Sequence, residues 1–416
     1  MDKILICLLA FLLIVGTVCG AFYLLNEKNF DEMIEYIDTF KFVEFDSPQI
    51  SVENVRPGLP GKLVPEKDDM GNWYFVTDDD FKVLHLTDIH LSGGVLNKET
   101  DKLTVKAVAA MVTAENPDLV VVTGDIAYAI GLGGTINNKY AHDMFIRLME
   151  NLGVYWTVTL GNHDTEPYNY HKRDAVANMY ADESLTYCLF EHSPENVSGE
   201  GNHIINVKNT SGEILQSLFM IDSHSYIRQD LVGGLIDSLA WNYDYIKQDQ
   251  IDWYERMINH YNPQSSMMFF HIPLAEVKEG YDEYIANGRQ TGGNVTWFSG
   301  HDGEKDDVVY PSKHGDELFE TIDRLQNTNY IFCGHDHFNN FVLGYKGVMF
   351  SYGYSVDYIA YGNIGQRGYQ RGCTVIEIDS MPGFVTVTHE NYYQEKYGSL
   401  EEKEMMDMNK DAYKGE

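Results

Sequence analysis

The sequence predicts an α/β fold with parallel strands in its first half and antiparallel strands near its end. Apolar runs at 83–86, 119–122 and 155–160 alternate with stretches in which apolar residues have helical spacing. A strand, a helix and a second strand form a crossover unit, which requires parallel strands. Four short apolar runs after residue 340 follow one another closely, a pattern typical of antiparallel strands.

The elements can be assigned in order. Residues 73–76 are predicted as a strand and 77–80 as a tight turn into the strand at 83, so a hairpin would start the globular domain. Asn116-Pro117 and Gly153 would end the first two crossover helices. The stretch 272–315 is rich in Gly, Asp and Asn and is predicted as loops over a site. The remaining expectations are helices at 101–115, 140–151, 248–261 and 316–325, paired strands at 203–207 and 215–221, and strands at 341–345, 348–352, 373–378 and 384–389.

Four segments are expected along the chain. Residues 4–25 carry no charge and approach the roughly 20 residues that cross a bilayer, so 1–25 is expected to be a membrane anchor or a cleaved signal peptide. Lys3 would keep the short end inside, which places the bulk of the chain outside the cytoplasm, membrane-anchored or secreted. A stalk at 26–70, a globular domain at 71–392 and an acidic disordered tail at 393–416 complete the prediction.

Composition and net charge limit the classes of partner that the chain is expected to bind. The chain has 416 residues and a formal net charge of −33, so binding of nucleic-acid polymers is not expected. A small anionic substrate remains compatible if metal ions provide a local positive centre. The five cysteines include no Cys-x-x-Cys pair and do not form a disulfide framework. No protein partner can be inferred.

Five apolar runs end in polar residues of the same few types. The blocks are Asp88-x-His90, Gly124-Asp125, Gly161-Asn162-His163-Asp164, His271 and Gly334-His335-Asp336-His337. In α/β sheets the carboxyl ends of strands are where ligands bind, so these side chains are expected to meet.

This ligand set has a definite chemistry. Asp, His and Asn suit Mn, Fe and Zn, and thiolates are absent from the set. One carboxylate can bridge two cations at about 3.5–4 Å, and such a pair lowers the pKa of bound water and neutralises charge in an in-line displacement. Phosphoester hydrolysis by a metal-bound hydroxide fits these parts best.

The order of the blocks resembles the calcineurin-like metallophosphoesterase superfamily over residues 81 to about 390. His271-Ile272-Pro273-Leu274 and the block from Gly124 to Tyr128 resemble its purple acid phosphatase side. The resemblance implies a four-layer α/β/β/α sandwich with two mixed sheets. It also implies that one metal is held by Asp88, His90, Asp125 and His337, and the other by Asp125, Asn162, His271 and His335, with Asp125 bridging. His163, oriented by Asp164, would protonate the leaving alkoxide or stabilise the transition state.

Tyr128 departs from a simple match. In the purple acid branch the Tyr of Gly-Asp-x-x-Tyr ligates ferric iron and the first block lacks its His, whereas this chain has both His90 and Tyr128. Either His90 is the ligand and Tyr128 a wall of the pocket, which we favour, or Tyr128 coordinates and His90 is displaced. Arg289 is a candidate for holding substrate, although no motif supports it. His85 is expected to be structural, and His224, His301 and Asp302 to be solvated.

The leading hypothesis is an exported or membrane-anchored hydrolase of phosphoesters that uses two metal ions. One alternative is a phosphodiesterase acting on lipid or nucleotide headgroups. Another is a non-catalytic extracellular protein that binds its metals structurally. His163 and Asp164 argue against this last reading, because a binding module has no need of a proton donor.

Overall fold

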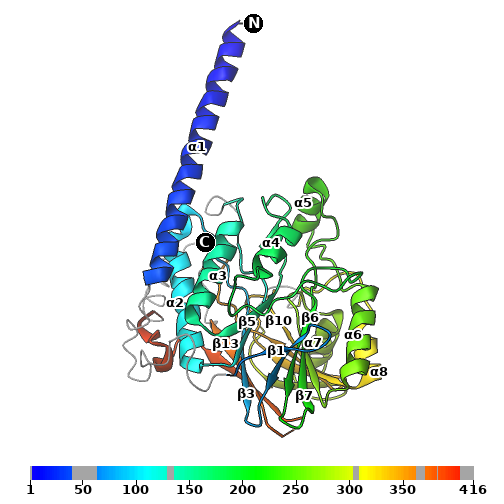
Figure 1. Cartoon of the computed structure of the whole chain (residues 1–416). Helices are drawn as coiled ribbons and strands as arrows, with labels where there is room; N and C mark the ends of the chain where they lie inside the picture. Colours follow the sequence, from blue (N-terminus) through cyan, green and yellow to red (C-terminus); the bar gives the residue numbers. More distant parts are fainter. Residues whose placement is uncertain are drawn as a thin grey trace.

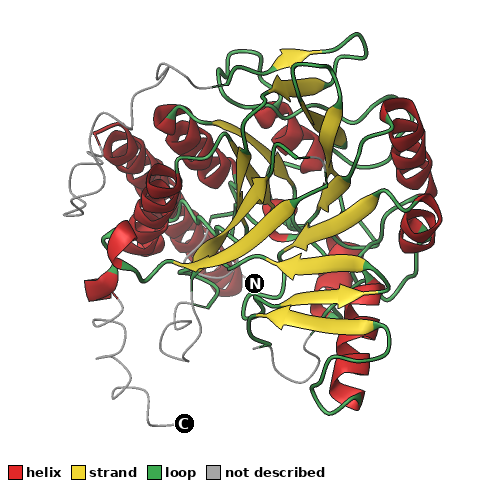
Figure 2. Ribbon diagram, turned by 90° about the horizontal axis from the view of Figure 1, so that it is seen from below, coloured by secondary structure: helices red, strands yellow, loops and turns green. Residues whose placement is uncertain are grey.

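The computed structural model describes residues 2–39, 63–128, 135–302, 309–361, 371–381 and 383–402. Within the first of these ranges it describes the side chains of residues 17 and 20–39. Two mixed sheets pack face to face, and helices cover their outer sides (Figures 1 and 2). Figure 2 looks along the projecting N-terminal helix and shows both sheets in the centre with helices on either side. The predicted four-layer sandwich is confirmed.

The smaller sheet, called here the small sheet, has five strands in the order β14-β13-β3-β4-β5. β3, β4 and β5 are parallel neighbours, and β13 runs antiparallel to both β3 and β14. This arrangement matches the expected crossover units followed by antiparallel strands. The strands are β3 (Phe81–Leu86), β4 (Leu119–Thr123), β5 (Tyr155–Thr159), β13 (Gly372–Ile378) and β14 (Val385–Asn391).

The larger sheet, called here the large sheet, has nine strands in the order β1-β2-β6-β7-β8-β10-β12-β11-β9. β7, β8, β10 and β12 form its parallel centre, and antiparallel pairs lie toward both edges. The strands are β1 (Glu66–Lys67), β2 (Trp73–Val76), β6 (His203–Lys208), β7 (Ile214–Met220), β8 (Ser266–Phe269), β9 (Val295–Ser299), β10 (Thr328–Cys333), β11 (Val342–Tyr345) and β12 (Val348–Tyr352).

The helices that cross between small-sheet strands end where the sequence predicts. α2 stops at Asn116 and α3 at Gly153, both in the left-handed conformation that closes a helix. The α-helices are α1 (Asp2–Thr39), α2 (Lys98–Glu115), α3 (Lys139–Leu152), α4 (Arg173–Tyr180), α5 (Leu231–Leu239), α6 (Gln248–Tyr261), α7 (Ala275–Ala286) and α8 (Leu318–Leu325), and short 3-10 turns occur at Val95–Asn97, His163–Thr165 and Glu395–Tyr397.

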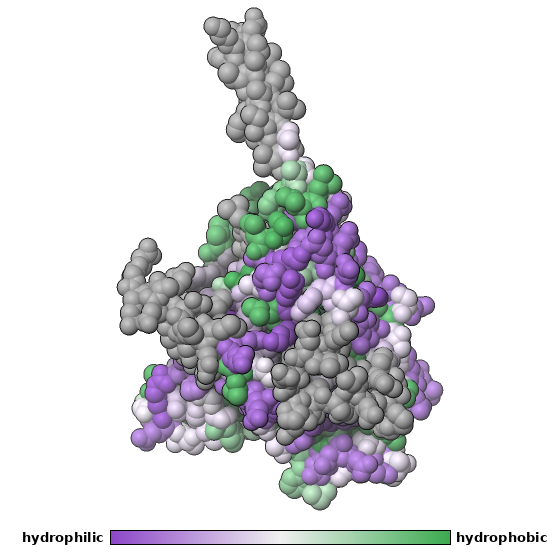
Figure 3. All heavy atoms as spheres, turned by 90° about the vertical axis from the view of Figure 1, so that its left-hand side faces the viewer, coloured by the Kyte–Doolittle hydropathy of each residue, from purple (hydrophilic) through white to green (hydrophobic). Residues whose placement is uncertain are grey.

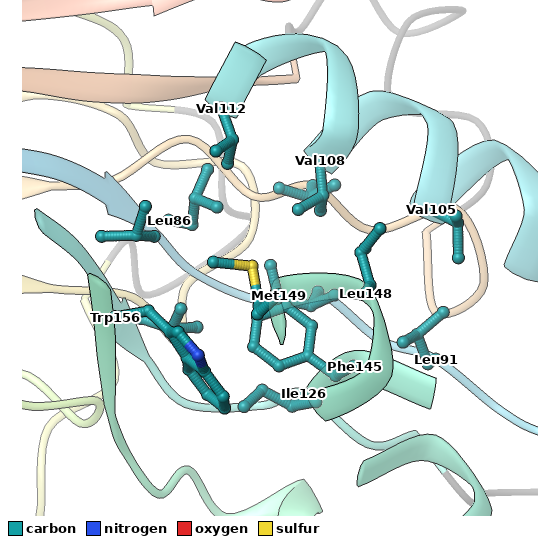
Figure 4. Close-up of a cluster of buried hydrophobic side chains, with 14 of the residues drawn as sticks. Leu86, Leu91, Val105, Val108, Val112, Ile126, Phe145, Leu148, Met149 and Trp156 are labelled. Carbon is teal, nitrogen blue, oxygen red and sulfur yellow. The ribbon is translucent and has the colours of Figure 1, made fainter. Parts of the chain in front are cut away.

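Three apolar layers hold the sandwich together. On β4, Val120 and Val122 face the helices while Leu119 and Val121 face the large sheet, which explains why this strand is apolar throughout. Figure 4 shows the layer outside the small sheet, where Phe145 and Met149 of α3 pack beside Trp156 of β5. A second layer fills the space between the sheets, and a third lies between the large sheet and α6, α7 and α8.

Two internal predictions are wrong. β2 pairs with β1 and β6 in the large sheet, while β3 lies in the small sheet, so residues 77–80 cross between sheets and do not close a hairpin. The same turn chemistry serves both purposes. The stretch 272–315 contains α7 and β9 and is not only loops. Val277, Tyr281 and Tyr284 are buried at helical spacing, but the Gly- and Asn-rich sequence around them obscures that spacing.

The structure also differs from the expected segments at both ends. Residues 26–39 belong to α1, with Asn26, Asn29, Met33 and Ile37 buried every three or four residues, so the predicted stalk is wrong there. Two of these four residues are polar, which hides the amphipathic spacing. Tyr397 and its neighbours to residue 402 pack on the domain instead of fraying. Residues 40–62 and 403–416 lie outside the described residues.

The predicted apolar segment at 4–25 falls on α1, mostly on residues whose side chains are not described. Among the described residues, no helix is both long enough and apolar enough to cross a membrane.

Candidate metal centre

The two sheets bring the strand-end residues to one place. β3, β4 and β5 lie side by side, so Asp88, Asp125 and Asn162 follow neighbouring strands at the same edge of the small sheet. β8 and β10 are parallel neighbours in the large sheet, and His271 and His335 follow them. A hydrogen bond from the Gly334 N–H to the His271 carbonyl joins these last two loops. The predicted convergence is found.

The first ligand group contains Asp88, His90, Asp125 and His337. All four are buried, and each offers one ligand atom within 4.8 Å of the others. His90 Nε2 lies 3.5 Å from Asp125 Oδ2, and His337 Nε2 lies 3.3 Å from Asp88 Oδ1. Two carboxylates and two imidazoles around one point form a site suited to a transition-metal cation.

The second ligand group contains Asp125, His271 and His335, again with ligand atoms within 4.8 Å. His271 Nε2 lies 3.0 Å from Asp125 Oδ2. Its Nδ1 lies 2.7 Å from the Thr123 carbonyl oxygen, a contact that makes Nδ1 the donor and leaves Nε2 as the ligand atom. Asp125 is therefore common to both groups, as a bridging ligand must be.

Unpaired buried atoms show that this cluster fits metal ions. Among the described residues, Asp125 Oδ2, His90 Nε2, His271 Nε2 and Asn162 Oδ1 are buried without a hydrogen-bond partner. Leaving one such group unpaired costs about 1–3 kcal/mol. Because several of these atoms lie together in one site, bound cations would supply the partners that they lack. Burial acts to lower the pKa of His90, but Asp357 and Asp125 outweigh it and raise the pKa to about 10. The carboxylates thus favour positive charge here.

Four of the ligand residues have strained backbones. Asp88, His90, Asp125 and His335 have φ values of 51°, 54°, 52° and 76°, which non-glycine residues seldom adopt. Such strain costs of order 1–3 kcal/mol per residue and concentrates at functional sites. It turns each side chain from its strand end toward the shared centre.

Two glycines let the strand-end loops approach one another. A Cβ on Gly161 would lie 2.1 Å from Asp125 Oδ1, and one on Gly334 would lie 1.9 Å from Thr87 Oγ1. No side chain fits at either position without moving a ligand loop. The Gly in the Gly-Asn-His-Asp and Gly-His-Asp-His blocks is therefore explained by packing.

Asp164 does not have its predicted role. Its carboxylate is wholly buried and accepts hydrogen bonds from the backbone N–H groups of Asp125, Ile126, Ala127 and Gly161 at 2.7–2.9 Å. It therefore holds the two ligand loops together and does not orient His163. The adjacent position in the motif suggested the partnership, but Asp164 binds backbone N–H groups while the His163 ring lies against another carboxylate.

Glu166 orients His163 instead. His163 Nδ1 lies 2.6 Å from Glu166 Oε1, and the Tyr226 hydroxyl donates to the same oxygen at 3.2 Å. The His163 backbone N–H donates to Asp125 Oδ1 at 2.8 Å, which ties the residue to the bridging ligand. Glu166 lies three residues after His163, a spacing that one helical turn could have indicated.

Sequence reasoning missed Asp357. This buried carboxylate lies 3.2 Å from His90 Nδ1 and 3.6 Å from His337 Nδ1, on the side away from the other ligands. It also accepts hydrogen bonds from the N–H groups of Ile359, Ala360 and Tyr361. It thus sets which ring nitrogen of both histidines faces the metal position. It follows no strand-end motif, so nothing in the sequence distinguished it.

Tyr128 lies beside His90 without displacing it. Its ring centroid is 4.7 Å from that of His90 and 5.1 Å from that of His163. Since His90 remains within the first ligand group, the geometry agrees with His90 as ligand and Tyr128 as a wall.

A cavity of about 550 Å³ opens beside the ligands. Its wall is mostly aromatic, and no lysine or arginine occurs among the described residues that line it. His163 reaches this wall together with two ligands. The lining includes Tyr128, His163, Tyr226, Ser238, Trp241, His335 and His337.

The remaining sequence candidates lie apart from the ligand groups. Arg289 pairs with Asp302 at 2.7 Å and does not line the cavity. His85 is buried and lies 2.7 Å from Thr123 Oγ1, consistent with its predicted structural role. His224 bonds to Gln250 at 2.8 Å, and His301 is exposed at the surface.

Comparison with known proteins defines the class. The family model of calcineurin-like phosphoesterases matches residues 81–339, so the chain belongs to this family. Within it, the chain is a distant homologue of purple acid phosphatase-like proteins. It is 26% identical over 335 residues to probable inactive purple acid phosphatase 28 of Arabidopsis thaliana, covering 73% of this chain and 76% of that protein. It is also 26% identical to probable inactive purple acid phosphatase 29 of the same plant, a match that covers 73% of this chain and 78% of that protein.

Among solved structures, a dimetal phosphatase from Danio rerio matches with 10% identity and a TM-score of 0.47. The match covers 75% of this chain and 96% of that chain.

Proposed function

We propose that this protein hydrolyses phosphoesters with the help of two metal ions. The observation that carries the proposal is that Asp125 belongs to both ligand groups, which places two cation positions next to each other. Bound there, two such ions would supply a water of lowered pKa and neutralise negative charge on the phosphoryl group. Mn, Fe and Zn all suit the ligands.

The protein's own residues provide the proton chemistry. In hydrolysis, the oxygen of water bonds to phosphorus, the bond from phosphorus to the leaving oxygen breaks, and that oxygen needs a proton. His163 lines the cavity, and Glu166 engages its Nδ1, so Nε2 is the nitrogen available to the substrate. The Glu166 carboxylate stabilises the imidazolium, which makes His163 suited to donate the proton.

The test is hydrolysis of para-nitrophenyl phosphate monoesters and diesters by protein reconstituted with Mn, Fe or Zn. We expect turnover that Asp125→Asn abolishes, because this change removes a ligand from both groups. Asp143→Asn, which alters a surface ion pair with Lys139 on α3, serves as the matched control and should retain activity. Equal rates for wild type and Asp125→Asn would refute the proposal. The monoester and diester arms separate a phosphatase from a phosphodiesterase acting on lipid or nucleotide headgroups.

A second candidate is a non-catalytic, metal-loaded binding protein. The names of the two Arabidopsis relatives, which include the word inactive, favour it. The pairing of Glu166 with His163 favours catalysis, because a structural metal site does not require a positioned proton donor. Two metals per chain with no hydrolysis of any ester in the panel would support this second candidate.

We also propose that the catalytic domain lies outside the cytoplasm, either anchored through residues 4–25 or secreted after cleavage. The uncharged sequence of this segment, preceded by Lys3, supports the proposal. Protease treatment of intact and lysed cells tests it. Cleavage of the domain in intact cells is expected, and protection until lysis would refute it.

A further inference from the structure

Helix α5 exposes its apolar residues and buries its two glycines and its carboxylate. Val232 is 67% exposed and Leu239 is 85% exposed, while Gly233, Gly234 and Asp237 are buried. Asp237 is buried and pairs with Arg228, so its negative charge does not lie on the exposed side of the helix. A helix on a protein surface normally has the opposite orientation. Contiguous exposed apolar residues of this kind mark an interaction surface.

The exposed residues of α5 continue toward α1. A Cβ on Gly234 would lie 2.7 Å from Pro167, so α5 packs closely on that loop, and the same loop carries Tyr170. The Tyr170 N–H bonds to the Ile136 carbonyl at 2.8 Å, and both side chains are exposed. Leu96 follows Val95, whose N–H bonds to Asn26 of α1. We define the apolar face by these residues and the exposed ones of α1 and α5: Phe22, Tyr23, Leu24, Leu25, Leu96, Ile136, Tyr170, Leu231, Val232, Leu235, Ile236 and Leu239.

α1 leaves the body at this face. Burial along the helix ends at Asn26, and residues 20–25 are exposed. Figure 1 shows that α1 rises from the same end of the body that α5 forms, and Figure 3 shows hydrophobic side chains gathered beneath the projecting helix. Residues 4–25, which carry no charge, lie on the continuous helix beyond this point. A bilayer that takes up those residues would therefore meet the apolar face.

We propose that the apolar face docks on a lipid bilayer, with α5 lying in the interface, and that the adjoining cavity takes phosphoester lipids from it. Ser238 of α5 and Trp241 just after it line the cavity, so the docked helix would place the cavity opening at the lipid surface. Amphipathic helices bind bilayers by burying such residues at the headgroup boundary. The net charge of −33 opposes anionic membranes, so the bilayer is one of neutral headgroups. The choice of substrate rests on the proposed function, whereas the docking does not.

The docking is tested with the full chain in phosphatidylcholine vesicles whose acyl chains carry bromine, a quencher of tryptophan. Leu239→Trp adds a fluorophore on α5. Phe384→Trp adds one at an exposed site between β13 and β14, at the end of the small sheet away from the metal ligands. We expect the bromine to quench the fluorescence added at position 239 and to leave the fluorescence added at position 384 unchanged. No quenching at 239, equal quenching at both, or failure of the chain to sediment with the vesicles would overturn the proposal.

The substrate class is tested by comparing a lipid ester with a soluble ester. Val232→Glu/Leu239→Glu should lower hydrolysis of fluorescent phosphatidic acid or phosphatidylcholine in vesicles about tenfold, since charge at the interface opposes docking. Hydrolysis of para-nitrophenyl esters should be unchanged, because neither residue lines the cavity. Met381→Glu/Phe384→Glu adds the same charge elsewhere and should change neither rate.

The outcomes separate the two levels of the proposal. Turnover of aryl esters without turnover of either lipid would overturn the substrate class and leave the proposed function standing. Failure to hydrolyse any ester would overturn the proposed function, while the quenching result would still decide the docking. A soluble dimer that Val232→Glu/Leu239→Glu dissociates would assign the face to a second copy of the chain and overturn the bilayer.

Discussion

The two sheets hold their shares of the metal ligands in different ways. On the small sheet, the loops carrying Asp125 and Asn162 are fixed to each other by Asp164, which takes four backbone N–H groups. On the large sheet, His271 is held by the carbonyl of Thr123 across the gap between the sheets. The His335 N–H likewise lies 3.3 Å from the Asp88 carboxylate. The small sheet therefore forms a self-supporting half, and the large sheet's ligands depend on it.

The largest effect should come from breaking the self-supporting half. Asp164→Asn places an amide NH₂ against buried backbone donors, so we expect the free energy of unfolding to fall by about 2–4 kcal/mol. Metal binding should weaken in both ligand groups, because both contain Asp125. Calorimetric unfolding and metal titration measure these effects, with Asp143→Asn as control. Loss in one group alone would contradict the dependence of the large-sheet ligands on the small sheet.

A change at Asp357 should affect one ligand group only. Asp357→Asn removes the charge behind His90 and His337, and such supporting contacts contribute about 10–100-fold to metal affinity. We expect metal affinity to fall by this factor in the group with Asp88 and to stay near normal in the group with His271. Isothermal titration should then show two separated binding steps. Parallel weakening of both steps would mean that Asp357 supports the whole cluster.

Glu166→Gln should spare the metals and slow the reaction. The neutral amide can still accept from His163 Nδ1 but stabilises the imidazolium less, so we expect kcat to fall about tenfold with KM nearly unchanged. Glu166 acts here as a positioning residue. Metal analysis of the variant provides the control. A normal kcat, or a loss of metal, would remove Glu166 from this role.

A bridge between the two halves should make the stability depend on pH. Arg173 donates to the carbonyls of Leu160 and Gly161 beside β5 and pairs with Asp222, which follows β7. Burial acts to raise the pKa of Asp222, but Arg173 outweighs it and the pKa falls to about 2. A depressed carboxyl pKa stabilises the fold above the unfolded value near pH 4, and this contribution is lost as the pH falls toward 2.

Acid should therefore weaken wild type more than Asp222→Asn. Between pH 5 and pH 2, we expect wild type to lose about 2 kcal/mol more of its free energy of unfolding than the variant loses. Urea unfolding at several pH values measures the difference. Identical pH dependence in the two proteins would show that the bridge does not carry the charge assigned to it.

The sequence predicted the ligands better than their supports. Asp88, Asp125 and His335 were found because each follows an apolar run, and this local pattern can be read from the sequence alone. Asp357 and Glu166 act through side chains that only the folded loops bring into contact. Their roles depend on tertiary geometry, and no local pattern records it.

The same distinction applies to the fold. The apolar runs and helical spacing identified the central strands and the crossover helices, because burial imposes those periods. α1 was missed where Asn26 and Asn29 occupy buried positions. α5 was missed because its apolar residues face outward and its small residues face inward, which reverses the usual signal.

The strained backbone at the ligands has an evolutionary consequence. Asp88, His90, Asp125 and His335 sit in a conformation that glycine adopts at lower cost, so folding alone would favour replacing them. A lineage that no longer used its metals could gain stability by doing so, one substitution at a time. This chain has a ligand side chain at all four positions, so the metal centre is built at a cost in backbone stability.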